Sequence, residues 1–456
     1  MTEQNQINQN DQYDAIIYKK YDQKMIRRYK RKIKDGNLEI MDPEITNLRF
    51  LENFEIQYLR LYISNCMSVR LRNNTINKLT VSNLMDEHSI FNLNDLELQN
   101  LEVLELENNG LKNDQLYNLF IFQKLHTLRV NNNKVDLTHI HNITNLTTLQ
   151  LQKCGLKNID QITSLVNLKD LDISSNRDLD LGPLFKVKGL SKLTMNNCCL
   201  TNIGQIVLLT NLEVLDISSN YLQTIDSIRL LVKLKELDIS FINNIDITPL
   251  KDLTGLIKLN LQQCKLSQLT ALKPLIKLQT LDLTYNQNIS ITDLQYFKNL
   301  IRLHLEGCGI VSIYILRSLM NLEELNISRN KIVYIDANLD QMTKLKQLHA
   351  QFNRINDFSS IEKLQQFNKS DDMHFYIDGQ QITTEEELHQ ANKYKNIERP
   401  NIQLKEIQNN RELLQTALNQ FKQEINTTMN NASQIQIQFT VNVVRLFQFL
   451  NQFGFE

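Results

Sequence analysis

Histidine and cysteine are the side chains of this sequence best suited to catalysis or metal binding. The eight histidines are scattered over the 456 residues, and only His139 and His141 lie close together. A zinc site needs three or four such ligands near one another, and the six cysteines include no CxxC pair. Glycine-rich phosphate loops, GxSxG and HExxH are also absent from the sequence. The sequence therefore predicts a protein that is not an enzyme and needs no metal or cofactor.

The charge balance and the hydropathy limit the partners and the location. The chain has 50 Lys and Arg against 51 Asp and Glu, a net charge of −1. A protein that wraps nucleic acid with its whole surface is strongly positive, so nucleic acid is not expected as the main partner. The first twelve residues are polar and no run of 18 apolar residues occurs. We therefore expect a cytoplasmic or nuclear protein that is not secreted and has no transmembrane segment.

Four of the six cysteines belong to a regular repeat. Segments such as LEVLDISSNYL from Leu212 and LIKLNLQQCKL from Leu256 follow the pattern L-x-x-L-x-L-x-x-N/C-x-L. Twelve copies cover about residues 101–366, and successive ninth positions lie 24, 21, eight times 22 and finally 23 residues apart. The ninth positions form a predicted structural ladder of Asn109, Asn133, Cys154, Asn176, Cys198, Asn220, Cys264, Asn286, Cys308, Asn330 and Asn353. At Ile242 the ladder is interrupted, and Asn243 or Asn244 is a candidate substitute.

The physical meaning of the repeat can be read from its spacing. The L-x-L part predicts a short strand with both leucines on one face, and stacked strands bury these leucines together. A buried asparagine at the ninth position can bond to the backbone of adjacent turns, and cysteine fits the same place as a small, weakly polar group. In the second half of the repeat, apolar residues recur every three positions, as at Leu222, Ile225 and Ile228. This period predicts 3₁₀ turns.

This pattern resembles the leucine-rich repeat family, in the 22-residue class found in protein-phosphatase regulatory subunits and in bacterial internalins. The resemblance implies an α/β solenoid, with a curved parallel β-sheet on its inner face and 3₁₀ turns and loops on its convex side. It also implies a non-catalytic scaffold that binds a partner protein on the concave strand face. A phosphatase-regulatory scaffold is the alternative that the repeat class suggests.

The outward-facing strand positions are the candidate binding surface. Asp172, Asp216, Asp238 and Asp282 share the central outward position, which predicts an acidic stripe that attracts a basic partner. Large aromatic residues follow some of these strands, and exposed aromatic side chains are common anchors of protein interfaces. The predicted partner-binding residues are Asp172, Asp216, Asp238, Phe241, Asp282, Tyr285, His304 and Phe352. The alternative is a solvated polar sheet face.

The two ends of the chain differ from the repeats. We expect a disordered N-terminus over 1–12, a basic amphipathic helix and N-terminal cap over 13–53, and a solenoid over 54–366 with degenerate repeats up to residue 100. A C-terminal cap over 367–400 and a helical, possible coiled-coil tail over 401–456 follow.

Each end carries a second functional hypothesis. In the N-terminal segment, Met25 and Tyr29 share one helix face and basic residues crowd the others. Nucleic-acid or anionic-membrane binding through this helix is therefore an alternative of another class. The 3/4 spacing of the tail predicts a helix that forms a homodimer or docks on a partner, whereas residues 434–444 also alternate like a strand. Among the degenerate repeats, Asn74 is expected at the ladder position.

Overall fold

The computed structural model describes residues 24–41, 48–63, 71–83, 96–108, 111, 116–335, 341–355 and 374–376. The chain divides into two compact units, Met1–Tyr394 and Lys395–Glu456, and every described residue lies in the first. The predictions for residues 1–12 and for the tail, including the choice between helix and strand at 434–444, fall outside the described residues.

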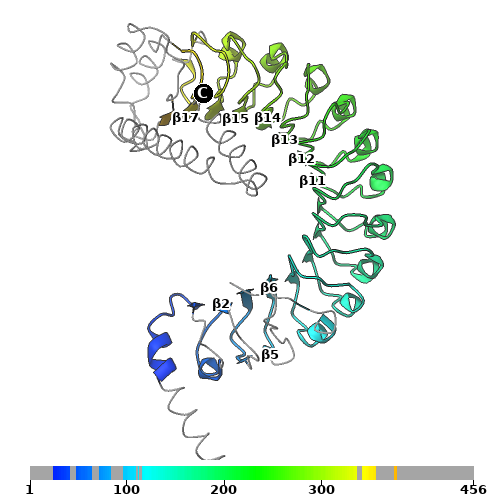
Figure 1. The fold of residues 1–456 in the computed structure, drawn as a ribbon, viewed down its shortest axis with the longest axis vertical. Helices are drawn as coiled ribbons and strands as arrows, with labels where there is room; N and C mark the ends of the chain where they lie inside the picture. The colour runs from blue at the N-terminus through cyan, green and yellow to red at the C-terminus, as the bar shows by residue number, and fades with distance from the viewer. Residues whose placement is uncertain are drawn as a thin grey trace, which may run out of the picture. The chain divides into compact units, whose positions relative to one another are not determined.

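Within the described residues the repeats form a 16-stranded parallel sheet, which we call the main sheet, and its strands follow one another in chain order (Figure 1). Its strands are β1 Asn37–Met41, β2 Tyr58–Ile63, β4 Lys78–Asn83, β6 Val103–Glu107, β7 Thr127–Arg129, β8 Thr148–Gln150, β9 Asp170–Asp172, β10 Lys192–Thr194, β11 Val214–Asp216, β12 Glu236–Asp238, β13 Lys258–Asn260, β14 Thr280–Asp282, β15 Arg302–His304, β16 Glu324–Asn326, β17 Gln347–His349 and β18 His374–Tyr376. A separate pair, β3 Leu71–Arg72 and β5 Leu96–Glu97, is also parallel.

The register of the sheet builds the core. Leu215 of β11 lies opposite Leu193 of β10 and Leu237 of β12, and all three are buried. Because each strand of the main sheet from β1 to β17 places a leucine at this position, and β18 places Phe375 there, the leucines stack in a continuous column and bury one another. This arrangement confirms that the L-x-L strands turn their leucines inward.

The second halves of the repeats form 3₁₀ turns, as predicted. These turns are η1 Arg49–Leu51, η3 Tyr117–Ile121, η4 Ile140–Asn142, η5 Asp160–Ser164, η6 Gly182–Lys186, η7 Gly204–Leu208, η8 Asp226–Leu230, η9 Thr248–Asp252, η10 Thr270–Leu272, η11 Thr292–Tyr296 and η12 Tyr314–Ser318. Leu222, Ile225 and Ile228 are buried, because a 3₁₀ helix has three residues per turn and brings every third side chain to the same side. In Figure 1 the strands line the inner side of the stack and the turns its outer side.

A short helix over residues 24–30 precedes β1. Its apolar side chains Met25 and Tyr29 are buried, since residues four apart share one helix face. The Tyr29 ring stacks on Phe50 of η1 with ring centroids 5.5 Å apart, and Phe50 meets Phe54 edge-on at 6.2 Å. The helix therefore packs its apolar face on the first 3₁₀ turn and leaves its basic face in solvent.

The prediction that Asn74 holds a ladder position is wrong. Asn74 is exposed, whereas Asn73 is buried and its amide donates to the backbone carbonyls of Leu51 (2.7 Å) and Phe54 (2.9 Å). The physical reason is that β3 pairs with β5 and does not belong to the main sheet, whose strands precede the ladder. Leu71 of β3 is buried, so Asn73, two positions later, faces inward and Asn74 faces outward.

The suggested substitutes for Ile242 are also wrong. Ile242 itself is buried, while Asn243 and Asn244 are exposed. An apolar side chain therefore occupies the ladder position in this repeat, and it can make no hydrogen bond there.

Candidate protein-binding surface

The four aspartates of the predicted acidic stripe lie in one column of the sheet, which we call the acidic column (Asp172, Asp216, Asp238 and Asp282). Asp216 of β11 lies directly opposite Asp238 of β12. One strand separates each of the other neighbours in the column. Because adjacent strands lie about 4.8 Å apart, the column brings four carboxylates together over six consecutive strands.

Each of these carboxylates also stabilises its own turn. One oxygen accepts a hydrogen bond from the backbone N–H two residues later, and the distances are 2.9–3.0 Å. The bonds join Asp172 to Ser174, Asp216 to Ser218, Asp238 to Ser240 and Asp282 to Thr284. Such a bond is the Asx turn that ends a strand. The Asp-x-Ser/Thr motif in the sequence signals this role, which was not among the predictions.

The second carboxylate oxygens of Asp216 and Asp238 accept hydrogen bonds from the side chains of neighbouring coils. Asn196 donates to Asp216 at 2.9 Å, and Asn260 donates to Asp238 at 2.8 Å. Burial raises the pKa of Asp238, and the adjacent Asp216 carboxylate adds to this effect, against the hydrogen bonds from Ser240 that lower it. The acidic column is therefore a half-buried, hydrogen-bonded surface rather than a row of free charges.

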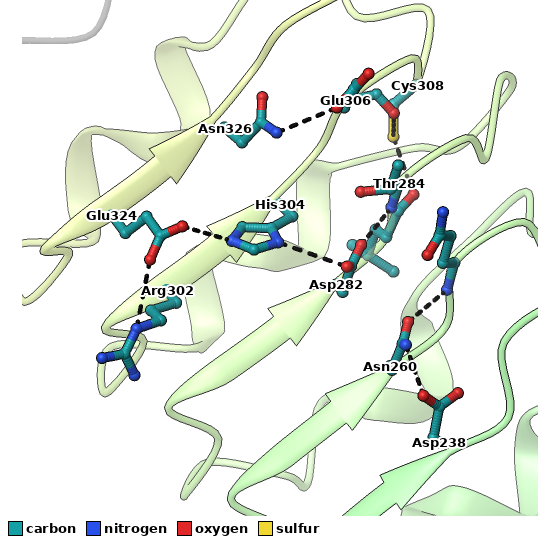
Figure 2. A network of polar contacts seen from close by, with 12 residues as sticks. Asp238, Asn260, Asp282, Thr284, Arg302, His304, Glu306, Cys308, Glu324 and Asn326 are labelled. Carbon is teal, nitrogen blue, oxygen red and sulfur yellow. Dashed lines mark hydrogen bonds and ion pairs between the residues drawn. The ribbon is translucent and has the colours of Figure 1, made fainter. Parts of the chain in front are cut away.

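His304 connects the end of the acidic column to the next strands (Figure 2). Its Nε2 lies 3.0 Å from Oε1 of Glu324, and its Nδ1 lies 3.5 Å from Oδ2 of Asp282. The hydrogen bond with Asp282 is the main cause that raises the pKa of His304, and Glu324 contributes. For Asp282, burial acts to raise the pKa, but the bonds from His304 and Thr284 outweigh it and lower the pKa.

The aromatic residues lie at the edge of the sheet, three residues beyond the ends of their strands. Phe241, Tyr285 and Phe352 are 41%, 39% and 48% exposed. They occupy the eighth repeat position, where every repeat has a left-handed backbone. The twelve residues are Asn108, Asn132, Lys153, Ser175, Asn197, Ser219, Phe241, Gln263, Tyr285, Gly307, Arg329 and Phe352. A left-handed backbone costs a residue other than glycine about 1–2 kcal/mol, and it is unusual for bulky side chains.

A chain of contacts fixes two of these rings. Tyr285 donates from its hydroxyl to Oε1 of Glu306 at 3.0 Å, and the same oxygen lies 3.1 Å from Nε of Arg329. The Arg329 guanidinium lies over the ring of Phe352, 4.6 Å from its centre. We call these four residues the aromatic edge. Its two rings are held in place before any partner arrives, which limits the entropy that binding would cost.

A glycine permits the position of Tyr285. Gly307 follows Glu306 at the same place in the next repeat, with φ at 65°. A Cβ added to Gly307 would lie within 2.7 Å of Cε1 of Tyr285 and closer still to Cδ1. The tyrosine ring therefore lies directly against the backbone of the next coil.

An open groove lies beside Tyr285. Its volume is about 660 Å³, and its wall consists of Asn244, Gln263, Lys265, Leu266, Tyr285, Gln287 and Asn288. Side-chain amides both donate and accept hydrogen bonds. The groove therefore offers partners to a peptide backbone that approaches the aromatic edge.

The asparagines of the ladder fasten consecutive coils. Asn220 is buried and donates to the carbonyls of Met195 (2.9 Å) and Ile217 (2.9 Å), and it accepts from the N–H groups of Cys198 and Leu200, both at 3.0 Å. The other described ladder asparagines, all of which are buried, are Asn133, Asn176, Asn286, Asn330 and Asn353. Asn109 lies outside the described residues.

The ladder cysteines make weaker links. Cys198 donates from Sγ to the carbonyl of Ile173 at 3.3 Å. Burial raises the pKa of Cys154 to about 11, that of Cys264 to about 12 and that of Cys308 to about 11. These thiols remain protonated at neutral pH, and a protonated, buried thiol is a poor nucleophile.

A second series of asparagines links neighbouring coils at the edge where the strands begin, opposite the ladder. Each precedes the first leucine of a repeat and donates to a carbonyl of the preceding coil at 2.8–3.1 Å. The series includes Asn145, Asn167, Asn211, Asn299 and Asn321. This series was not predicted, although the recurrent Asn-Leu pair in the sequence is its signal.

The described part of the chain contains no group of three His, Cys, Asp or Glu side chains that could hold a metal ion. Within the same residues, no helix is long and apolar enough to cross a membrane. His141 lies with Nδ1 2.9 Å from the carbonyl of Thr138, a contact within its own turn.

Solved structures share this architecture. An internalin of Listeria monocytogenes is 27% identical, with 63% of this chain and 82% of that chain covered and a TM-score of 0.53. A leucine-rich-repeat protein of Leptospira interrogans is 24% identical, with 80% of this chain and 95% of that chain covered and a TM-score of 0.62. No protein-family model and no curated protein sequence matches the chain.

Proposed function

Because the chain is a leucine-rich-repeat solenoid similar to internalins, we propose that it is a non-catalytic scaffold that binds a partner protein on the concave strand face and along the aromatic edge. The aromatic edge is the observation that carries this proposal. Tyr285 and Phe352 are exposed on a left-handed backbone, where an asparagine or glycine would be less strained. Since all twelve clear repeats have this backbone, what distinguishes these two positions is the large exposed aromatic side chain, a common anchor of protein interfaces.

The acidic column and the aromatic edge have different roles in this proposal. Charges at the rim of an interface mainly set the association rate, whereas buried aromatic anchors mainly set the dissociation rate. The acidic column would attract a partner with a basic surface, and Phe241 and Tyr285 would then become its buried anchors. The amide-lined groove beside Tyr285 would receive the backbone of the partner.

Other parts of the chain support the scaffold in this proposal. The helix over 24–30 would close the N-terminal end of the core, because it covers Phe50 of the first 3₁₀ turn. The tail would join two copies of the chain, and the protein would act in the cytoplasm. A phosphatase-regulatory role rests on the repeat class alone, so a phosphatase catalytic subunit is one specific partner to look for.

The test is an affinity purification with the full chain, followed by binding kinetics with the partner it identifies. We expect Phe241→Ala and Tyr285→Ala each to weaken binding of that partner by at least about 2 kcal/mol, which raises Kd roughly 30-fold. The matched control is Tyr296→Ala, which removes a half-exposed tyrosine from η11 on the outer side. Normal binding by both the Phe241→Ala and the Tyr285→Ala variant would refute the proposal.

The acidic column can be tested without disturbing its turns. Asp238→Asn combined with Asp282→Asn removes two charges, but an asparagine oxygen can still accept the backbone bond of the Asx turn. We expect slower association and a weaker salt dependence, with a nearly unchanged dissociation rate. An unchanged association rate would remove the acidic column from the binding surface.

A further inference from the structure

A second exposed surface has the opposite charge. Residues 24–34 contain seven Lys and Arg and no acidic residue, although the whole chain has a net charge of −1. The side chains of Lys24, Arg27, Arg28 and Arg31 are exposed. They have the spacing i, i+3, i+4 and i+7, which places them along one side of the helix over 24–30 and of the turn that follows it. We call these four residues the basic stripe.

The helix is anchored by its other side. Met25 and Tyr29 are buried, and Tyr29 stacks on Phe50. Lys32 lies over the Tyr29 ring, with Nζ 5.0 Å from its centre. Two of the apolar side chains that an amphipathic helix would insert into a bilayer, Met25 and Tyr29, are therefore already used in the core of the protein, and Ile26 and Ile33 are half-buried. What the helix presents to a partner is charge.

The shape and composition of the stripe fit a polyphosphate strand. Seven residues of helix extend over about 10 Å, and double-stranded nucleic acid carries one negative charge per about 1.7 Å of its axis. Because this spacing counts both strands, the stripe spans about six phosphate charges of a duplex, or about three of either strand. Three of its four residues are arginines, whose guanidinium groups bind phosphate oxygens through two parallel hydrogen bonds.

We propose that the basic stripe binds the phosphate backbone of nucleic acid without reading its sequence. Tyr29, the only aromatic residue of the helix within the described residues, is buried against Phe50, so the stripe itself offers charge and no ring on which bases could stack. A local patch suffices for such binding, and the charge of the remaining chain does not prevent it. This site is independent of the concave strand face.

The experiment measures binding of a fluorescently labelled 20-base-pair duplex of arbitrary sequence to the full chain by anisotropy. Four phosphate contacts predict a slope of about −3.6 for log K against log salt, so Kd should rise on the order of 100-fold between 50 and 200 mM salt. A second duplex of unrelated sequence should bind equally well. Absence of binding at 50 mM salt would overturn the proposal.

Charge reversal locates the site. We expect Arg27→Glu combined with Arg31→Glu to raise Kd at least 10-fold and to reduce the salt slope by about two. The matched control is Lys186→Glu combined with Lys188→Glu, which makes the same charge change at exposed residues near η6 and should bind normally. Equal losses in both variants would show that only the net charge matters, and would overturn the assignment to the stripe.

Two further arms complete the test. If the reversed variant melts at a lower temperature, Arg27→Gln with Arg31→Gln replaces it, and normal duplex binding by that variant would refute the proposal. Vesicles that contain phosphatidylserine serve as a second probe. Retention of the chain on these vesicles without any duplex binding would assign the stripe to membranes instead.

Discussion

The ladder makes a prediction whose size follows from the structure. Asn220→Ala removes an acceptor from the buried N–H groups of Cys198 and Leu200. A buried polar group without a partner costs about 1–3 kcal/mol, so two such groups predict a loss of about 2–6 kcal/mol in the free energy of unfolding. The carbonyls that the amide served, such as that of Met195, tolerate the loss of a donor better than an N–H tolerates the loss of an acceptor.

A cysteine of the same ladder is the natural comparison. Cys198→Ala removes only a thiol that donates to carbonyl oxygens, and a thiol is a weak donor. We therefore expect a loss of about 1 kcal/mol. Asn243→Ala, a change of the same type at an exposed position of the adjacent repeat, should leave stability unchanged.

The assay is urea unfolding followed by circular dichroism for the three variants and the unaltered chain. The unaltered chain and Asn243→Ala should have the highest urea midpoints. Cys198→Ala should have a lower midpoint, and Asn220→Ala the lowest. If Asn220→Ala unfolds no earlier than Cys198→Ala, the reasoning from unpaired N–H groups is wrong.

The remaining predictions concern the aromatic edge, two histidines and the tail. Gly307→Ala should push the Tyr285 ring out of its position and weaken binding of the partner about as much as Tyr285→Ala. If the Gly307→Ala variant binds the partner with unchanged affinity, the aromatic edge is not held in place as described. Since the folded-state pKa of His304 is raised, its ion pairs should stabilise the fold below about pH 6.5 and lose this effect as pH rises through the raised pKa; His304→Gln should thus lower the melting temperature more at pH 5.5 than at pH 9. Burial lowers the pKa of His349, so His349→Gln should have the opposite pH dependence, and the same trend in both variants would contradict the opposite pKa shifts of the two histidines. Light scattering should find the full chain dimeric and residues 1–394 monomeric, and equal masses per chain would exclude dimerisation by the tail.

The repeat spacing was sufficient to predict the strands, the inward leucines and the 3₁₀ turns, because each depends on a local period of the sequence. It could not predict the left-handed backbone at Phe241 and Tyr285. The other residues at this position include Asn, Ser, Lys, Gln and Arg, and they share no side-chain property. The conformation follows from the stacking of the coils, because each coil must turn at the same point to pack on its neighbours.

The dual role of the aspartates was hidden for a different reason. An outward-facing Asp in a strand suggests a charge offered to solvent, whereas its bond to the N–H of residue i+2 depends on how the strand ends. At Asn74 the error was to place the strand before it in the main sheet, whereas β3 pairs only with β5 among the described strands. The contacts of Tyr285 with Glu306 and of Arg329 with Phe352 join different repeats, so no pattern within one repeat announces them.

The alternation of asparagine and cysteine also determines where the stack can open. Each asparagine ties its coil to the preceding one through several hydrogen bonds, whereas Cys264 offers the coil of Ile242 a single thiol bond, to Ile239, and Ile242 itself offers none. The stability of such a stack is approximately the sum of the stabilities of its coils and of the interfaces between neighbouring coils. Two weak interfaces in succession therefore form the place where the stack should open first. Backbone amides of residues 234–255 should therefore exchange with deuterium sooner than those of the coils on either side. Phe241 lies on this coil, so the surface proposed for binding includes the coil expected to open most easily among the described ladder positions 133–353, and a bound partner would stabilise its contacts with the neighbouring coils.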